Sequence, residues 1–313
     1  MTGTTSRGGQ PTERARAVVP SVYVSTACIR PTEPLRTRLE AYQSAGLRSV
    51  ELGAGVAVSD RDLRELSSLG LDLLVHNYFP PPADPFVLNL ASADPEILQR
   101  SETLVREAMR LCVGLGVPVY TVHAGFVTDP VGFDGMSFRF PEPEQGEAER
   151  AFERFSVVIT RVTGEAEELG LALLVENNVC TPALKGRLLL QTPLEFGELF
   201  QRLDGPMPGI LLDTGHLNVS AHTLGFDRME FVRRHRDRIR AVHLHDNDGT
   251  ADQHRPAEKD SWTHDALDYL FEGRRMSLPI IVEAAFPDVQ GLAAYVHGLA
   301  DRLCDAVALR GQS

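Results

Sequence analysis

The heptapeptide Gly170-Leu-Ala-Leu-Leu-Val-Glu176 contains a pattern that recurs along the chain: a glycine or turn, a short apolar run and a polar residue at its end. A short apolar run between turn signals is typical of a strand buried on both faces, as in a parallel sheet. An apolar segment at 21–29 predicts the first strand. The pattern itself recurs at 46–51, 70–76, 116–123, 209–213, 239–243 and 277–283.

Helical segments are predicted between these strands. Residues 94–116 begin with Asp94-Pro95-Glu96, in which aspartate is a good N-cap and proline fits the first turn. Residues 145–169 place Phe152, Phe155, Ile159 and Val162 on one face. Further helices are predicted at 32–45, 192–203, 226–237, 263–272 and 287–309.

Alternating strands and helices indicate an α/β fold with a parallel sheet that helices cover. Eight strand–helix units are the number found in a (β/α)8 TIM barrel, and 313 residues fall within the range of one such barrel. A doubly wound open sheet is the competing fold. It is disfavoured because no G-x-G-x-x-G motif follows an early strand.

Composition narrows the class of protein. Hydrophobic residues make up 43% of the chain and charged residues 24%, as in ordinary soluble proteins. The net charge of −12 argues against a dedicated nucleic-acid surface but is compatible with a metal site, which needs anionic ligands.

The N-terminal segment and the cysteines predict a cytoplasmic protein. Residues 1–18 have no apolar signal core and are predicted to be a disordered leader before a single catalytic domain at 19–313. Four cysteines without a C-x-x-C pair are typical of reduced thiols in the cytoplasm. No apolar run approaches the roughly 20 residues of a membrane span. The sequence leaves open whether the chain forms a homo-oligomer.

The polar residues at the strand ends predict the functional site. Six such positions carry residue types that bind metals: His76, His123, Glu176, Asp213, His243 and Glu283. In a TIM barrel the carboxyl ends of the strands meet at one mouth, where catalytic residues lie. His216 follows Asp213 by three residues, and the dense segment 241–254 adds Asp252 and His254. These nine residues are the predicted metal ligands.

Other polar residues receive weaker interpretations. His245 alternates with His243 on a strand and is expected to point away from it. Glu51 is either a site residue or an internal polar group of the barrel. A further set flanks the predicted ligands and would contact either a substrate or the ligands: Asn77, Tyr78, Asn177 and Asn178. Four histidines are expected at the surface: His222, His235, His264 and His297. The loop at 126–145 is predicted to be a lid over a small molecule.

These residues resemble those of the xylose isomerase-like TIM barrels, which include sugar and sugar-phosphate isomerases and epimerases and the endonuclease IV group. The resemblance covers roughly 20–305 and is carried by Val175-Glu-Asn177, Leu212-Asp-Thr-Gly-His216, Val242-His-Leu-His-Asp246, Asp252-Gln-His254 and Val282-Glu283.

The resemblance implies two alternative chemistries. In the isomerases and epimerases, residues matching Glu176, Asp213, His243 and Glu283 hold one divalent ion, and the two glutamates are catalytic because they exchange the substrate proton. In endonuclease IV, residues matching all nine positions hold three zinc ions. The implied cofactor is therefore one to three divalent ions, either Zn²⁺ or Mn²⁺.

Two departures from the endonuclease group favour the first chemistry. Arg255-Pro-Ala-Glu-Lys-Asp260 stands where that group has a Gly-Glu-Gly stretch, and the 126–145 loop is acidic. The sequence thus predicts a metal-dependent isomerase or epimerase that forms an enediolate from a small carbohydrate, with nucleic acid disfavoured as a partner. The alternatives are a zinc phosphodiesterase of the abasic-site endonuclease type and a metal-binding module without catalysis.

Overall fold

The computed structural model describes residues 21–29, 33–54, 56, 58–134, 137–274 and 277–310. The predicted leader at 1–18 lies outside them.

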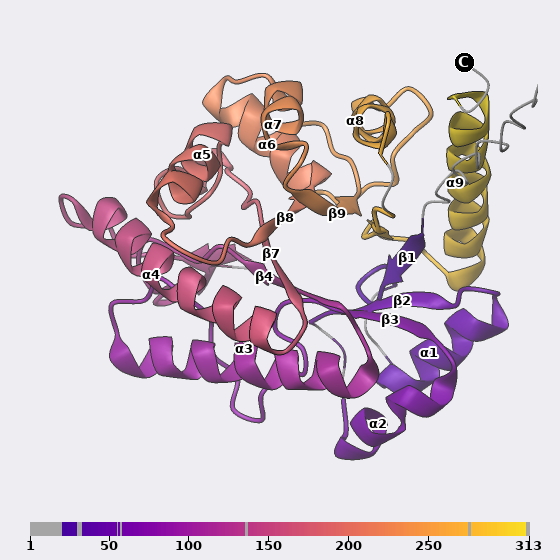
Figure 1. Cartoon of the computed structure of the whole chain (residues 1–313), viewed down its shortest axis with the longest axis horizontal. Coiled ribbons are helices and arrows are strands. Elements are labelled where there is room, and N and C mark those ends of the chain that lie inside the picture. The colour runs from indigo at the N-terminus through magenta and orange to yellow at the C-terminus, as the bar shows by residue number, and fades with distance from the viewer. Residues whose placement is uncertain are drawn as a thin grey trace, which may run out of the picture.

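Eight parallel strands form a closed barrel in the described residues, which confirms the predicted TIM barrel (Figure 1). Around the barrel the order is β1-β10-β9-β8-β7-β4-β3-β2, and β1 pairs with β2 to close it. The strands are β1 (Val22–Ser25), β2 (Ser49–Leu52), β3 (Asp72–Val75), β4 (Val119–His123), β7 (Ala172–Glu176), β8 (Gly209–Asp213), β9 (Ile239–Leu244) and β10 (Ile280–Val282). Each lies within or next to a segment that the apolar pattern predicted.

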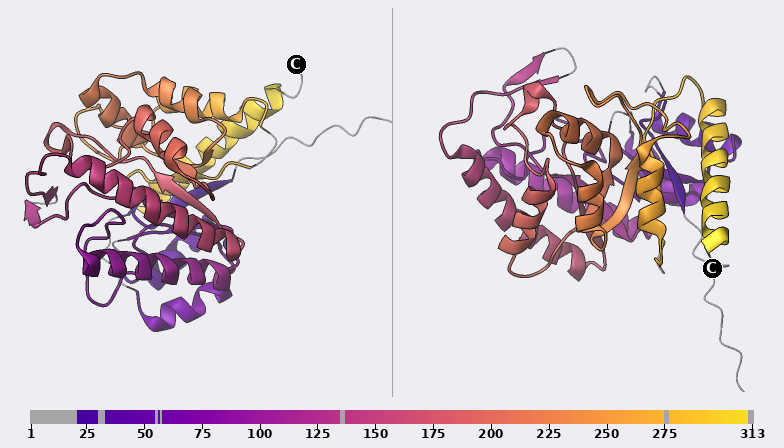
Figure 2. Two further views of the ribbon diagram at one scale, coloured as in Figure 1. Left: turned by 60° about the vertical axis from the view of Figure 1, so that its left-hand side comes forward. Right: turned by 90° about the horizontal axis from the view of Figure 1, so that it is seen from above.

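The α-helices lie outside the barrel, as Figures 1 and 2 show. They are α1 (Leu35–Ser44), α2 (Asp60–Glu65), α3 (Pro95–Leu115), α4 (Glu147–Glu168), α5 (Pro193–Arg202), α6 (Thr214–Leu224), α7 (Arg228–His235), α8 (Trp262–Phe271) and α9 (Val289–Arg310). Two short 3-10 helices, η1 (Leu66–Leu69) and η2 (Pro182–Leu184), complete the set. The seven predicted helices are all present, whereas α2 and α6 were not predicted. No described helix is both long enough and apolar enough to cross a membrane.

Local sequence signals set the ends of α3. The Asp94 carboxylate accepts the N–H of Glu96 at 2.8 Å, and Pro95 occupies the first turn. Gly116 ends the helix with a φ of 70°, a left-handed conformation that glycine adopts without steric cost. The predicted inward residues of α4 are all buried: Phe152, Phe155, Ile159 and Val162.

The predicted lid region contains an antiparallel hairpin of β5 (Gly132–Asp134) and β6 (Ser137–Arg139). It follows β4, and Figure 2 shows that it projects from the body of the barrel. The loop between β4 and α4 is therefore partly ordered into a strand pair.

Candidate metal centre

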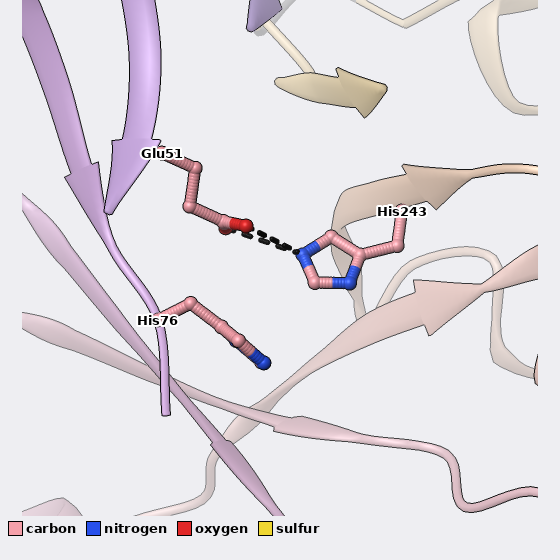
Figure 3. A group of neighbouring side chains, drawn as sticks. All are labelled: Glu51, His76 and His243. Atoms are coloured by element: carbon pink, nitrogen blue, oxygen red, sulfur yellow. Dashed lines mark hydrogen bonds and ion pairs between the residues drawn. The ribbon is translucent and has the colours of Figure 1, made fainter. Parts of the chain in front are cut away.

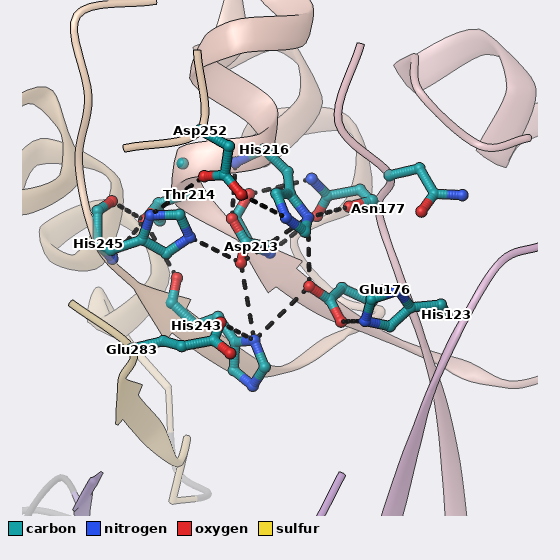
Figure 4. A network of polar contacts seen from close by, with 12 residues as sticks. His123, Glu176, Asn177, Asp213, Thr214, His216, His243, His245, Asp252 and Glu283 are labelled. Carbon is teal, nitrogen blue, oxygen red and sulfur yellow. Dashed lines mark hydrogen bonds and ion pairs between the residues drawn. The ribbon is translucent and has the colours of Figure 1, made fainter. Parts of the chain in front are cut away.

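The nine predicted ligands all lie at the carboxyl end of the barrel. His123, Glu176 and Asp213 are the last residues of their strands, and His76 and Glu283 directly follow theirs. The strand register sets His123 beside Glu176 and Asp213 beside His243. His216 comes from the first turn of α6, and Asp252 and His254 come from the loop between β9 and α8. Figure 4 shows most of them as one polar network.

His243 is the centre of the first group of possible ligand atoms. Three carboxylates approach its Nδ1: Glu283 at 2.9 Å, Glu176 at 3.6 Å and Asp213 at 3.7 Å. Three of these four side chains are almost fully buried, and Glu283 is 15% exposed. Nitrogen and carboxylate ligands at this spacing suit a divalent ion such as zinc or manganese. We call these four residues the central set.

A second group forms around the other oxygen of Glu176. Its Oε2 lies 3.1 Å from Nε2 of His123 and 3.4 Å from Nε2 of His76. The hydroxyl of Thr121 lies 2.6 Å from Nδ1 of His76 and so fixes the orientation of that ring. We call His76, His123 and Glu176 the β4 set. Because Glu176 uses a different oxygen for each set, its carboxylate can bridge two ions.

The third group is built on Asp252, whose Oδ2 lies 3.0 Å from Nε2 of His254 and 3.4 Å from Nε2 of His216. Each imidazole donates its other N–H to a backbone carbonyl: His254 to Glu283 at 2.9 Å and His216 to Asn177 at 3.0 Å. Donation of one N–H to a carbonyl is usual for histidines that bind a metal, because it leaves the other nitrogen for the ion. Here both Nε2 atoms lie beside the same carboxylate. We call Asp252, His216 and His254 the loop set.

His245 belongs to this network, so the expectation that it points away from the site was wrong. Its Nε2 lies 3.0 Å from Oδ2 of Asp213, and its ring stacks on that of His254 with centroids 4.2 Å apart. Side chains two residues apart on a strand point to the same face, so the spacing from His243 places His245 on the side of the site. A Cβ at Gly215 would lie 2.0 Å from the His245 ring, so only glycine in the Asp-Thr-Gly-His segment leaves room for it.

Glu51 is a partner of the central set, which resolves a question that the sequence left open. Its two oxygens lie 3.1 and 3.2 Å from Nε2 of His243, and Figure 3 shows it facing that ring with His76 nearby. A carboxylate on Nε2 holds the proton there and leaves Nδ1 as the lone pair for a metal.

The flanking asparagines separate into two groups. Asn177 supports the site, because its side chain bonds both the N–H and the carbonyl of Asp213 at 2.8 and 3.0 Å. Asn178 is also buried and donates to the carbonyls of Gly125 and Leu189. Asn77, in contrast, lines a cavity beside the β4 set together with Tyr78.

Of the four histidines expected at the surface, His222 and His297 are exposed. His235 and His264 are buried, so the expectation was wrong for both. His235 packs against the rings of Phe196, Phe200 and Phe231 and belongs to the buried face of α7.

The site carries a strong negative field. Burial opposes protonation of His243, but Glu51, Glu283 and Glu176 outweigh it and hold the pKa of this imidazole well above its ordinary value. Burial likewise opposes protonation of His254, yet Asp252 raises its pKa to about 9. Burial raises the pKa of Glu283, and His243 with His254 lowers it to about 2 as the net result. A field that holds protons on buried imidazoles also favours a divalent cation, which takes their place on the ligand atoms.

Unsatisfied polar atoms show that the described residues fit a metal. One buried atom in each set has ion-pair contacts but no hydrogen bond of suitable geometry within the described chain: Oε2 of Glu176, Nδ1 of His243 and Oδ1 of Asp252. A buried polar atom without a partner costs about 1–3 kcal/mol. Because metal coordination would satisfy such atoms, the donor set fits one or more divalent ions.

A sequence model of the xylose isomerase-like TIM barrel matches residues 39–297. The chain belongs to this family. The resemblance read from the strand-end motifs is therefore confirmed.

The solved structures of this fold include both enzyme classes that the motifs suggested. A D-tagatose 3-epimerase-like protein superposes with a TM-score of 0.71 and 20% identity, covering 93% of this chain and 99% of that one. Endonuclease IV from Thermus thermophilus gives a TM-score of 0.54 and 18% identity, covering 91% and 99%. At these identities the likeness shows the fold alone.

A curated relative adds no activity. The uncharacterized protein y4fM of Sinorhizobium fredii (strain NBRC 101917 / NGR234) is 26% identical over 156 residues. The match covers 50% of this chain and 43% of that protein, which is less than half of its length.

Proposed function

We propose that the protein is a divalent-metal-dependent isomerase or epimerase that acts on a small polyhydroxylated carbonyl compound, a sugar or sugar phosphate. The observation that carries the proposal is the position of Glu176 and Glu283. They approach the same nitrogen of His243 from β7 and β10, which β8 and β9 separate in the barrel. A substrate bound at the central set would therefore have a carboxylate on either side.

Bound at the central set, a divalent ion supplies Lewis-acid polarisation of a substrate carbonyl and so favours an enediolate. Glu283 is the more available base, because its side chain is 15% exposed and only His243 among the imidazoles lies within 4 Å of its carboxylate. Glu176 is 2% exposed, and four imidazoles surround it. We therefore assign removal of the carbon-bound proton to Glu283. Return of the proton by the same residue gives isomerisation, whereas delivery by Glu176 to the opposite face gives epimerisation.

The charges in the loops after β3 and β4 favour a small substrate over a nucleic acid. Three acidic side chains there are 87–90% exposed: Asp84, Glu142 and Glu144. Each pairs with an arginine, so the charges of these three arginines are already paired. A phosphate backbone is bound through unpaired lysine and arginine charge, which these pairs do not offer.

The β4 and loop sets favour a second candidate, a multinuclear zinc phosphodiesterase. Proton transfer with one ion does not need His76, His123 or His254, yet all three face the network. Ions held by these sets would supply activation of a water molecule and stabilisation of a leaving oxygen. The bridging position of Glu176 is the specific feature that supports this alternative.

Solvent exchange separates the two candidates. The protein, loaded with Zn²⁺ or Mn²⁺, is incubated in heavy water with ketoses, aldoses and their phosphates, and carbon-bound deuterium is measured by NMR. We expect deuterium at the carbon next to the carbonyl, and we expect Glu283→Gln to stop its uptake. The matched control is Glu258→Gln, which changes an exposed glutamate between β9 and α8 and should leave the exchange intact.

A second assay tests the alternative with the same preparation. Nicking of a duplex that contains an abasic site, without deuterium uptake by any sugar, would contradict the isomerase proposal. Elemental analysis of the protein purified without chelator gives a further test. One ion per chain would favour proton transfer, and two or three would favour hydrolysis.

A further inference from the structure

A cavity of about 560 Å³ opens beside the β4 set, and its walls are mainly apolar. Four aromatic residues line it: Tyr78, Phe86, Phe126 and Phe138. His123 lines it as well, so the cavity adjoins the candidate metal centre. This volume falls within the range of small-molecule sites, about 300–1,000 Å³.

The loop after β3 forms one wall and is held in place by its own contacts. The N–H of Phe86 donates to the hydroxyl of Tyr78 at 2.8 Å, and the two rings lie 6.0 Å apart. Arg100, from α3, places its guanidinium 4.4 Å from the centre of the Phe86 ring. Tyr78 adopts a φ of 64°, a conformation that a bulky residue keeps only when its surroundings enforce it.

The segment after β4 forms the other wall. The rings of Phe126 and Phe138 pack with centroids 5.5 Å apart. The N–H of Phe126 donates to Oδ1 of Asn89 at 3.0 Å, and a Cβ at Gly125 would come within 2.9 Å of that same oxygen. The backbone at Gly125, with a φ of 94°, thus carries Phe126 into place. Both walls are preformed, as in most ligand sites.

The cavity has few groups that could bind hydroxyls. Among the described residues that line it, only Asn77, Tyr78 and His123 carry polar side chains, and the Tyr78 hydroxyl already accepts a bond from Phe86. A sugar placed here would lose hydrogen bonds to water without replacing them, at about 1–3 kcal/mol for each buried group left unpaired. An apolar or aromatic group would instead gain from contact with the rings.

We propose that the substrate is a conjugate: a hydroxylated carbonyl group binds at the metal centre, and an aryl or similarly apolar substituent occupies this cavity. The first half rests on the proposed function, and the second rests on the cavity alone. The aromatic walls then select among carbonyl compounds by the substituent that they carry.

A matched pair of α-hydroxyketones tests this specificity. Hydroxyacetone and 2-hydroxyacetophenone present the same carbonyl and hydroxyl, and differ in carrying a methyl or a phenyl group. Binding of each to the metal-loaded protein is measured by titration calorimetry. We expect the phenyl compound to bind at least about 10-fold more tightly, as burial of one aromatic ring predicts.

Two variants place the effect in the cavity. Phe86→Ala removes one wall, and Val87→Phe fills the space from a residue that also lines it; each should abolish the preference for phenyl while metal content is unchanged. Val131→Ala is the control, because Val131 lies next to β5, is 59% exposed and does not line the cavity. It should retain the full preference.

Equal binding of the two ketones, or a preference that survives in both cavity variants, would overturn the proposal. The readout is binding, so it is independent of turnover. Deuterium uptake by sugars without a phenyl preference would leave the isomerase proposal standing and remove this one. A phenyl preference without deuterium uptake by either the sugars or the phenyl ketone would leave the apolar binding site standing and remove the isomerase proposal.

Discussion

Two buried histidines in this protein lie in opposite surroundings. At the barrel mouth, His243 is enclosed by the carboxylates of Glu51, Glu176, Asp213 and Glu283. Between α5 and α7, His235 is surrounded by phenylalanine rings and donates one bond, of 2.9 Å, to the carbonyl of Pro193. Carboxylates hold the pKa of His243 above its ordinary value, whereas burial lowers that of His235.

Burial of a histidine is therefore not by itself a sign of function. The bond that His235 donates to Pro193 satisfies one ring nitrogen, so the ring serves as a packing residue with a single polar contact. His243 has an unsatisfied nitrogen and an excess of negative charge around it. An unsatisfied group of this kind destabilises the fold unless a ligand completes it.

Substitutions at the barrel mouth should have their largest effect on metal binding. His243→Ala or Asp213→Ala should weaken binding at the central set by more than about 100-fold, since loss of even an outer partner of a ligand costs about 10- to 100-fold. His235→Gln should bind metal as tightly as the unchanged protein. Titration with a competing chelator measures all three affinities. Unchanged occupancy in both mouth variants would rule out the assignment of the central set.

Removing the metal should destabilise the mouth and leave the α5–α7 contact intact. At a free metal concentration 100 times the dissociation constant, binding adds about 2.7 kcal/mol to the free energy of unfolding. Denaturant unfolding with metal and with chelator should differ by about that amount for the unchanged protein and for His235→Gln. His243→Ala should show a much smaller difference, and an equal one would place the metal elsewhere.

Glu51 provides a sharper test, because it contacts the central set through Nε2 of His243. Glu51→Gln keeps the size of the side chain but removes the charge that fixes the proton on Nε2. We expect a loss of about 10- to 100-fold in metal affinity, the usual range for the partner of a ligand. Glu258→Gln, at an exposed site, serves as the control. An unchanged affinity in Glu51→Gln would make Glu51 a structural residue only.

Sequence patterns predicted the barrel because its strands are short apolar runs that end in turns. They missed α6, which begins directly after Asp213 and buries small or polar residues such as Thr214, Asn218 and Ser220 in place of an apolar stripe. They also missed the hairpin after β4, where the 126–145 loop has no clear alternation of apolar and polar residues.

The positions of the six strand-end residues were predictable because parallel strands bring their carboxyl ends to one mouth. That they bind metal stays a prediction. His245 was missed because alternation was misapplied: residues two apart on a strand share a face, so His245 belongs on the same side as His243. Gly215, in the adjacent segment, was the signal of a ring packed against the backbone. His235 was misplaced although it follows Phe231 by four residues, the spacing of a shared helix face.

The smallest predicted effect is the pH dependence that His235 contributes. Because burial lowers its pKa in the folded protein, the unfolded chain, with a pKa of about 6.5, takes up a proton more readily. The stability that neutral His235 provides is therefore present above pH 6.5 and is lost as the pH falls below that value. The loss cannot exceed about 1.4 kcal/mol per pH unit.

His235→Gln, whose amide can still donate to Pro193 but does not titrate, should remove this part of the pH dependence. The unfolding free energies of the two proteins are measured with chelator between about pH 7.5 and about pH 5, on either side of the ordinary histidine pKa of about 6.5. The side chains of the mouth titrate in the same way in both proteins, so the difference between the two free energies isolates the contribution of His235. We expect the unchanged protein to lose stability faster on acidification. A constant difference across the range would show that His235 keeps its ordinary pKa in the fold, and that burial among the phenylalanine rings does not lower it.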